Sequence, residues 1–238
     1  MSAIDRFSAR AIATRSRGRI VLALVVTFCA QAASAQTRPV AFVDAATIVP
    51  GLIVEMRYAG AHNFVGRPID GYEAPHCLLT RPAASALAAV AADLKPQGLV
   101  PKVFDCYRPA RAVANFVRWA RALKDQKMKA EFYPNVDKRT LFRDGYIATH
   151  SGHSRGSTMD LTLAKADGTE LDMGTHFDFF SPHSWTADHS VGAKAHANRM
   201  LLATAMRRRG FYGYFREWWH FTLRGEPFPR TYFDFVVK

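Results

Sequence analysis

The sequence predicts an α+β fold, a single domain in which a largely antiparallel or mixed sheet is flanked by helices. Segments with helical spacing and segments with strand character are mixed along the chain without a regular βαβ repeat. The composition, 49% hydrophobic and 22% charged, is that of an ordinary globular protein. No internal repeat or low-complexity linker divides the chain, so residues 36–238 suit one domain with a substantial core.

Three helices are expected from apolar spacing and end signals. Residues 82–94 are rich in Ala and Leu, and Thr80 is a candidate cap before them. Residues 110–124 place apolar side chains at helical spacing. Residues 194–209 form the third helix, which Gly210 ends because glycine readily adopts the left-handed conformation that follows a helix.

Four segments have strand character. Residues 52–58 and 99–104 are β-like runs, residues 158–163 alternate polar and apolar side chains, and residues 218–223 are aromatic. The stretch 126–144 is polar and aromatic without a clear period. We expect it to be a long loop over the surface.

The first 35 residues have the composition of a signal peptide. Five arginines precede an apolar run, 20–30, that is too short for a comfortable membrane span. Ala33-Ser34-Ala35 supplies the small residues that a signal peptidase needs. We therefore expect cleavage before Gln36, export to the periplasm and no stable membrane insertion afterwards. The alternative is a retained N-terminal membrane anchor.

The chain is basic, with 32 Lys and Arg against 20 Asp and Glu. Removing the five arginines and one aspartate of residues 1–35 leaves 27 basic and 19 acidic residues, a net charge of +8. Such a charge suits an exported protein beside an anionic envelope. No compact basic stripe with interleaved aromatic residues is present, so we expect no nucleic-acid partner. The oligomeric state is left open.

Two cysteines, Cys77 and Cys106, remain after the predicted cleavage. An oxidising compartment permits a disulfide between them, and two buried thiols are the alternative. Their spacing leaves both open, because pairing depends on the Cα separation. No Cys-x-x-Cys pair is present, which excludes a cysteine-rich zinc site.

The segment SGHSRGSTMD indicates a metal site. His153 and Asp160 are seven residues apart, and Gly152 and Gly156 allow a tight turn between them. The alternation after the turn places Asp160 on the polar face of a strand whose other face is core. A carboxylate there needs a cationic partner, because burial of an unpaired charge is costly. A divalent metal ion supplies one.

The segment REWWH supplies a second pair, Glu217 and His220. A catalytic zinc site uses three protein ligands and keeps the fourth position for water. His153, Asp160 and His220 are those three candidates, and Glu217 is free to act as the base. On a regular strand, residues 217 and 220 would point to opposite faces. We therefore expect a bend, or one helical turn, between them.

Arg108 lies between a buried-looking strand and a helix, in the segment DCYRP. At such a strand end it could point into a cleft and stabilise a developing oxyanion. The alternative from spacing alone is a surface arginine paired with Asp105.

These segments together resemble a known family. DCYRP, SGHSRGSTMDLTL, MGTHFDFF and EWWH, with NFVGRPIDGYE and FYPNVDK, are similar to motifs of the D-alanyl-D-alanine dipeptidases. These enzymes belong to the zinc D,D-peptidases of peptidase family M15. The resemblance runs from about Tyr58 to Thr222 and implies the family's fold, a small α+β domain with a confined site.

The resemblance also implies roles for individual residues. It matches the three ligands to one zinc ion per chain and matches Glu217 to the catalytic base. It matches Arg108 to the arginine that stabilises the transition state. Ser151 and Asp178 match residues that hold the free amino end of the substrate. Tyr58 is a candidate for the wall of the substrate site.

The activity implied is zinc-dependent hydrolysis of free D-alanyl-D-alanine to two D-alanine molecules, by a zinc-bound water that Glu217 activates, in cell-wall peptide turnover. One alternative is a D,D- or L,D-carboxypeptidase that trims peptidoglycan stem peptides. Another is a non-catalytic zinc-containing module that binds cell-wall peptide. The presence of Glu217 argues against the module, which would be expected to lack the base.

Overall fold

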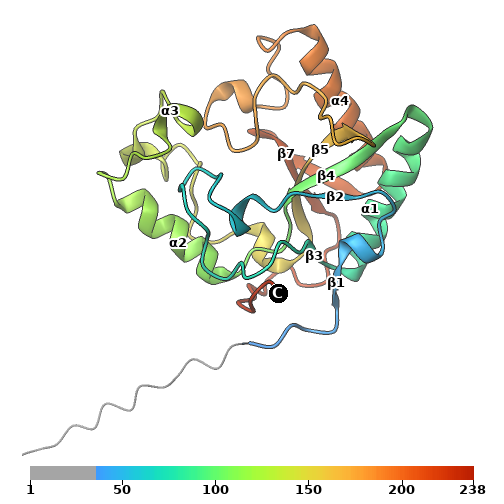
Figure 1. Ribbon diagram of the computed structural model, residues 1–238, viewed down its shortest axis with the longest axis horizontal. Helices are drawn as coiled ribbons and strands as arrows, with labels where there is room; N and C mark the ends of the chain where they lie inside the picture. Colours follow the sequence, from blue (N-terminus) through green and yellow to red (C-terminus); the bar gives the residue numbers. More distant parts are fainter. Residues whose placement is uncertain (1–35) are drawn as a thin grey trace, which may run out of the picture. The chain divides into compact units, whose positions relative to one another are not determined.

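The computed structural model describes residues 36–238, so the predicted signal peptide over residues 1–35 lies outside the described part of the chain. A five-stranded sheet forms the centre of these residues (Figure 1), in the order β2-β4-β5-β7-β6. β2 and β4 pair in parallel and the other neighbours are antiparallel. The strands are β2 (Ile53–Val54), β4 (Leu99–Asp105), β5 (Thr158–Lys165), β6 (Phe211–Tyr214) and β7 (Glu217–Leu223). The mixed sheet confirms the predicted α+β class.

Smaller elements complete the fold. β1 (Phe42–Asp44) and β3 (Leu78–Thr80) make a separate antiparallel pair. The α-helices are α1 (Arg81–Leu94), α2 (Ala110–Arg121), α3 (Lys129–Phe132) and α4 (Ala193–Arg208). Short 3₁₀ turns are η1 (Ala45–Thr47), η2 (Arg57–Ala59), η3 (Lys95–Gln97), η4 (Lys138–Thr140), η5 (Gly152–Arg155) and η6 (Pro182–Ser184).

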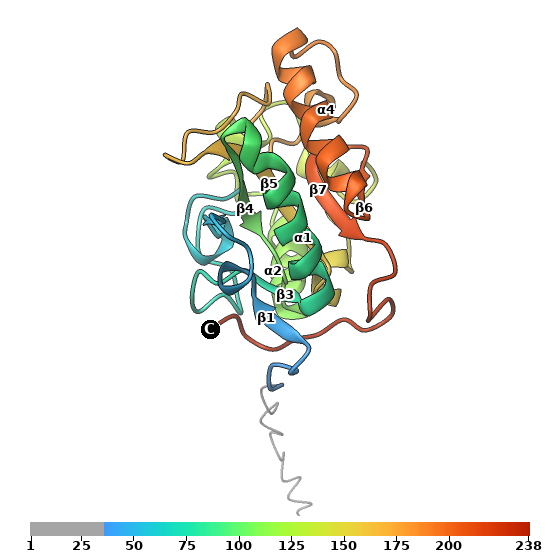
Figure 2. The same ribbon diagram turned by 90° about the vertical axis from the view of Figure 1, so that its right-hand side faces the viewer.

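The sheet lies between helices. α1 packs on β4 and also contacts α4, which packs on β6. α2 lies on the side of β4 and β5 opposite α1, as the two perpendicular views show (Figures 1 and 2). Among residues 36–238, no helix combines the length and the apolar character that a membrane span requires.

The predicted helices and strands are present, with shifted ends. The expected strand 52–58 shrinks to the two residues of β2, and η2 follows it. α2 stops at Arg121 rather than at residue 124, because Ala122 leaves the helical region with a ψ of 74°. Strand β5 is buried from Thr158 to Ala164, so both its faces are covered. This agrees with the expectation that Asp160 is a buried carboxylate in need of a cationic partner.

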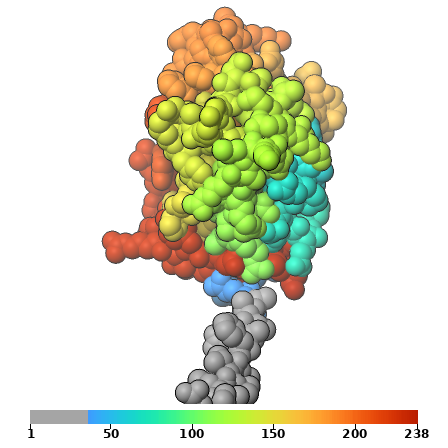
Figure 3. Space-filling view, turned by 90° about the vertical axis from the view of Figure 1, so that its left-hand side faces the viewer, coloured from blue at the N-terminus to red at the C-terminus, as the bar shows by residue number. Residues whose placement is uncertain are grey.

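The stretch 126–144 is more than a surface loop. It contains α3 and η4, and it buries Phe132, Tyr133 and Leu141. The Tyr133 ring packs edge-on against Trp119 of α2. The apolar residues of this stretch follow no regular spacing in the sequence, because an irregular backbone directs their side chains into the core. Together with α2 the stretch forms much of one face of the protein (Figure 3).

Cys77 and Cys106 are joined in a disulfide, with their Cα atoms 5.2 Å apart. Cys77 immediately precedes β3, and Cys106 immediately follows β4. The bond ties the small sheet to the end of a central strand. Of the two alternatives that the spacing left open, the structure has the disulfide.

Candidate active site

Two carboxylates and one imidazole meet where β4, β5 and β7 lie side by side. The register pairs Asp105 with Asp160 and Asp160 with His220. Directly opposite residues of antiparallel strands project from the same face of the sheet. The strand pairing alone therefore brings three residues that are distant in sequence to one point on the sheet.

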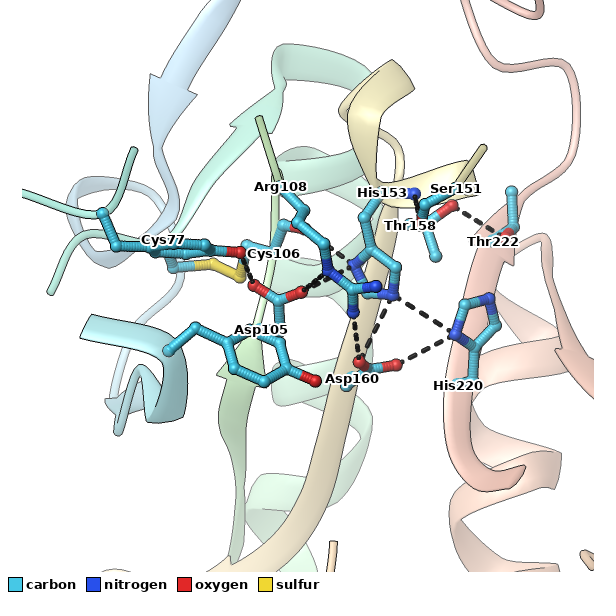
Figure 4. A network of polar contacts seen from close by, with 12 residues as sticks. Cys77, Asp105, Cys106, Arg108, Ser151, His153, Thr158, Asp160, His220 and Thr222 are labelled. Atoms are coloured by element: carbon cyan, nitrogen blue, oxygen red, sulfur yellow. Dashed lines mark hydrogen bonds and ion pairs between the residues drawn. A yellow bond between two sulfur atoms is a disulfide. The ribbon is translucent and has the colours of Figure 1, made fainter. Parts of the chain in front are cut away.

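His153 joins this group from the η5 turn, which precedes β5. Its Nε2 atom lies 3.3 Å from Asp160 Oδ2 and 3.2 Å from His220 Nδ1. One potential ligand atom from each of these three residues lies within 4.8 Å of the others. Figure 4 shows the three side chains pointing toward one another. The turn ends at Gly156, whose φ of 81° is a left-handed conformation that glycine adopts readily.

The hydrogen bonds fix the form of His153. Its Nδ1 atom lies 2.7 Å from the Cys106 carbonyl oxygen. A carbonyl can only accept, so Nδ1 carries a proton, and in the neutral imidazole the free lone pair is then on Nε2. A metal-binding histidine usually donates its second ring nitrogen to a carbonyl or carboxylate in this way.

Asp160 also has the properties of a metal ligand. Its Oδ1 atom is buried, and His220 Nδ1 lies 3.0 Å from it. Burial disfavours the carboxylate, but the neighbouring His153 and His220 outweigh burial and hold the pKa of Asp160 well below its ordinary value. Two imidazole nitrogens and a carboxylate form a donor set that suits zinc. These three residues therefore fit a divalent metal ion.

Glu217 and His220 face the same cavity because β7 is irregular. Tyr214 of β6 pairs with Glu217, while the preceding Gly213 pairs with Phe221, so the register shifts between them. Such a bulge re-aims side chains within a strand. As a result Glu217 Oε2 lies 3.5 Å from His220 Nδ1. The predicted bend between the two residues is present in this form.

Glu217 is poised as a base. Burial raises its pKa to about 7, and the charge of His220 only partly offsets this. Catalytic carboxylates that take up a proton near neutral pH are commonly tuned by burial in this way. Burial also disfavours the His220 imidazolium, but its hydrogen bond to Asp160 and the charge of Asp160 raise the pKa of His220 above its ordinary value.

Arg108 is paired with Asp105, as the surface alternative required, but the pair is buried. Arg108 Nε donates to Asp105 Oδ2 at 2.8 Å, and the Arg108 side chain is only 13% exposed. Arg108 Nη2 lies 3.6 Å from Asp160 Oδ2 (Figure 4). The guanidinium also lies 5.1 Å from the centre of the Tyr58 ring. The arginine thus lines the cavity beside the three candidate ligands.

The remaining candidates line another part of the cavity. Tyr58 donates to Asp178 Oδ2 at 2.7 Å, and both side chains are buried. Burial, with the charge of Asp160, raises the pKa of Asp178 well above its ordinary value. Ser151 caps η5 by accepting from the His153 backbone N–H at 3.2 Å. The structure therefore brings all eight predicted site residues to one cavity.

This cavity has a volume of ≈ 350 Å³. Ligand pockets of roughly 300–1,000 Å³ are usual, so it lies at the small end of the range. Aromatic and aliphatic side chains make up the rest of the wall, among them Phe64, Phe116, Tyr146, Phe180, Tyr214 and Trp219. The size favours a substrate of one or two amino acids.

Sequence reasoning did not assign a role to Asp105 beyond a surface partner for Arg108. Its side chain is fully buried, its Oδ2 atom lies 3.3 Å from His153 Nδ1, and Tyr72 donates to its Oδ1 at 2.6 Å. The sequence feature that could have identified Asp105 is its position at the end of an apolar strand, where a buried carboxylate needs partners. His150 is exposed and also lies at the cavity wall.

Comparison with known proteins agrees with this site. The family model described as D-ala-D-ala dipeptidase matches residues 38–238. The D-alanyl-D-alanine dipeptidase of Enterococcus faecium is 41% identical over 192 residues, which cover 80% of this chain and 95% of the relative. That of Streptomyces coelicolor is 41% identical over 198 residues, covering 83% and 97%. That of Escherichia coli is 37% identical over 181 residues, covering 76% and 83%. The chain therefore belongs to the D-ala-D-ala dipeptidase family of metallopeptidases.

Proposed function

We propose that this protein hydrolyses free D-alanyl-D-alanine to two molecules of D-alanine, using zinc held by His153, Asp160 and His220. The observation that carries the proposal is one small cavity with these three residues and Glu217 on its wall together with a buried carboxyl group, Asp178. Two relatives that this chain matches over nearly their whole length are D-alanyl-D-alanine dipeptidases, and they support the same substrate.

When bound, zinc would polarise the scissile carbonyl and lower the pKa of the attacking water. Glu217 takes a proton from that water and later delivers it to the departing amino group. The raised pKa of Glu217, about 7, suits both transfers near neutral pH. Arg108 places a fixed positive charge beside the carbonyl oxygen, where negative charge develops in the transition state.

Asp178 gives the site its preference for a free amino end. Burial raises the pKa of this carboxyl group and so favours its neutral form, whereas an entering ammonium would stabilise its charged form. Tyr58 holds one carboxyl oxygen, and Ser151, which also lines the cavity, would add a hydrogen bond to the ammonium. An N-acylated peptide brings no positive charge, so the buried carboxyl group would gain no partner.

The decisive assay uses the purified chain with zinc, without zinc and with a chelator. Release of D-alanine is measured from D-alanyl-D-alanine and from its N-acetyl derivative. The dipeptide should be cleaved in a zinc-dependent manner and the acylated compound should not. Cleavage of the acylated compound alone would instead identify a carboxypeptidase of stem peptides. Zinc binding without any hydrolysis would identify a binding module.

We also propose that the protein works in the periplasm, after removal of residues 1–35. The Cys77–Cys106 disulfide supports this, because disulfides persist mainly in oxidising compartments. Cell fractionation with N-terminal sequencing of the isolated protein tests it. A protein that begins at Gln36 in the periplasmic fraction is expected, and an intact N-terminus in the cytoplasm would contradict the proposal.

A further inference from the structure

Arg199 is a buried charge that the proposed mechanism does not use. It lies in α4, and its side chain is fully buried. Within residues 36–238 it forms no salt bridge. A buried charge normally requires a partner of opposite sign or a full set of hydrogen bonds. What satisfies this guanidinium therefore identifies what the residue holds in place.

Backbone and hydroxyl oxygens satisfy it. Nε donates to the Met173 carbonyl at 2.7 Å, and Nη1 donates to the Trp185 carbonyl at 2.7 Å. Nη2 donates to the His183 carbonyl at 2.8 Å and lies 3.4 Å from Thr175 Oγ1. All four acceptors belong to one segment, residues 173–185. The planar guanidinium thus joins the two ends of a segment whose only regular structure is the short turn η6.

The same segment forms part of the substrate cavity. Asp178 and Phe180 lie on the cavity wall, near the middle of the segment. Asp178 has a φ of 61°, and it alone among the non-glycine residues described has a positive φ. Such a conformation persists only when the surrounding structure holds it. The segment's own backbone supplies no strand or α-helix to do so.

We propose that Arg199 is a positioning residue for Asp178 and thereby a determinant of the recognition of the substrate's free amino end. By fixing Met173, His183 and Trp185, the guanidinium holds the backbone on both sides of Asp178. The carboxyl group is then presented to the cavity at a defined place. This inference rests on the proposed function, since it assigns Asp178 the substrate ammonium.

Lysine cannot replace arginine here. Lysine carries a single ammonium, whereas arginine has five N–H donors in a planar fork. Arg199→Lys keeps the charge and loses the simultaneous bonds to both ends of the segment. Arg209→Lys is the matched control, because Arg209 immediately follows α4 and pairs with Asp93 at the surface. It contacts neither the 173–185 segment nor the cavity.

The test measures kcat, KM, zinc content and thermal unfolding for the zinc-loaded chain with D-alanyl-D-alanine. For Arg199→Lys we expect KM to rise about tenfold, with kcat and zinc content nearly unchanged. A tenfold loss of binding corresponds to about 1.4 kcal/mol. Arg209→Lys should match the wild type. If Arg199→Lys does not fold, Arg199→Gln, which keeps two N–H donors without the fork of the guanidinium, should still raise KM.

A double-mutant cycle with Asp178→Asn separates positioning from general destabilisation. If Arg199 acts through Asp178, the combined variant should have the KM of Asp178→Asn alone. Multiplicative effects on KM, an unchanged KM in folded Arg199→Lys, or a fall in kcat alone would overturn the inference. Failure of the wild type to cleave the dipeptide would overturn the proposed function instead, so the two failures are distinguishable.

Discussion

Asp105 accepts a 2.8 Å hydrogen bond from Nε of Arg108, and the pair forms one buried unit at the end of β4. Tyr72 donates to the other carboxyl oxygen at 2.6 Å, so the carboxylate is held from two sides. The bond occupies the Nε edge of the guanidinium and leaves Nη2 on the side of Asp160. Asp105 therefore sets the direction in which Arg108 presents its charge to the cavity.

Asp105→Asn should lower kcat by about 10²-fold, because loss of one oxyanion-stabilising group typically costs 10²–10³-fold. The carboxamide keeps the shape but removes the charge that holds the arginine. Zinc content should stay at one per chain. The measurement is steady-state hydrolysis of the dipeptide together with metal analysis. Asp93→Asn is the control, since Asp93 pairs with Arg209 at the surface. An unchanged kcat in Asp105→Asn would contradict this role.

Glu217→Gln should reduce kcat by roughly 10²–10⁴-fold, the usual contribution of a general base. The amide has nearly the same size and cannot accept a proton from water. Because Glu217 is not among the three candidate ligands, the variant should still bind one zinc ion per chain. Rates are compared at equal zinc occupancy, with Glu226→Gln as the control at a carboxylate that pairs with Arg155. Retention of wild-type activity in Glu217→Gln would exclude the proposed base.

Zinc binding should release protons between about pH 6 and 7.5. The pKa of Glu217 is raised to about 7 by burial, and the pKa of His220 is raised mainly by Asp160. The cation stabilises the Glu217 carboxylate and displaces the proton from His220, so affinity rises with pH in this window. Calorimetric titration in buffers of different ionisation enthalpy counts the protons. Equal heats in all buffers would contradict the prediction.

The same two groups make the metal-free fold sensitive to pH. Each holds its proton more tightly in the folded chain than in the unfolded chain. Their contribution to the stability of the folded chain is fully present below the pKa values of the unfolded chain, which are about 4.3 for Glu and 6.5 for His. It is lost as pH rises through the folded values. The melting temperature of chelator-treated protein should therefore fall between pH 5 and 8, by less in Glu217→Gln than in the wild type.

Replacing both Cys77 and Cys106 by Ala should destabilise the fold by about 3–4 kcal/mol, the loop-closure contribution expected for a separation of 29 residues. For a chain of this size the melting temperature should drop by roughly 10 °C. Calorimetry of the double variant measures the change, and reductant should have no further effect on it. A melting temperature equal to that of the wild type would show that the bond adds no stability.

Much of this architecture is predictable from sequence, since local patterns encode it. Residues 82–94 and 194–209 form helices within a residue of the predicted ends, because apolar spacing and end signals agree there. Two short motifs also contain the candidate metal ligands that the fold brings together. Phe132 and Tyr133 were not assigned to the core, because their ring contacts are with residues that only the folded chain brings near. Tyr133 contacts Trp119 and Phe180. Phe132 contacts His62 and His176.

The supporting residues were harder to predict for the same reason. Asp105 and Arg108 are three residues apart, which suits an exposed ion pair as well as a buried one. Arg199 lies 21 residues from Asp178 in the sequence, and nothing in a helix of mixed composition indicates which oxygens its side chain reaches. A bend or helical turn between Glu217 and His220 was expected only because both side chains had to face one metal site.

Cys106 takes part in two structural devices at once. Its sulfur forms the bond to Cys77, and its carbonyl oxygen accepts the hydrogen bond that fixes the protonated nitrogen of His153. The covalent cross-link and the chemistry of a metal ligand thus share one residue. The peptide group between Cys106 and Tyr107 is held a second time, because the Tyr107 N–H donates to the Leu78 carbonyl oxygen at 2.9 Å. A variant that lacks the cysteine pair would therefore keep one contact that orients the carbonyl oxygen toward His153.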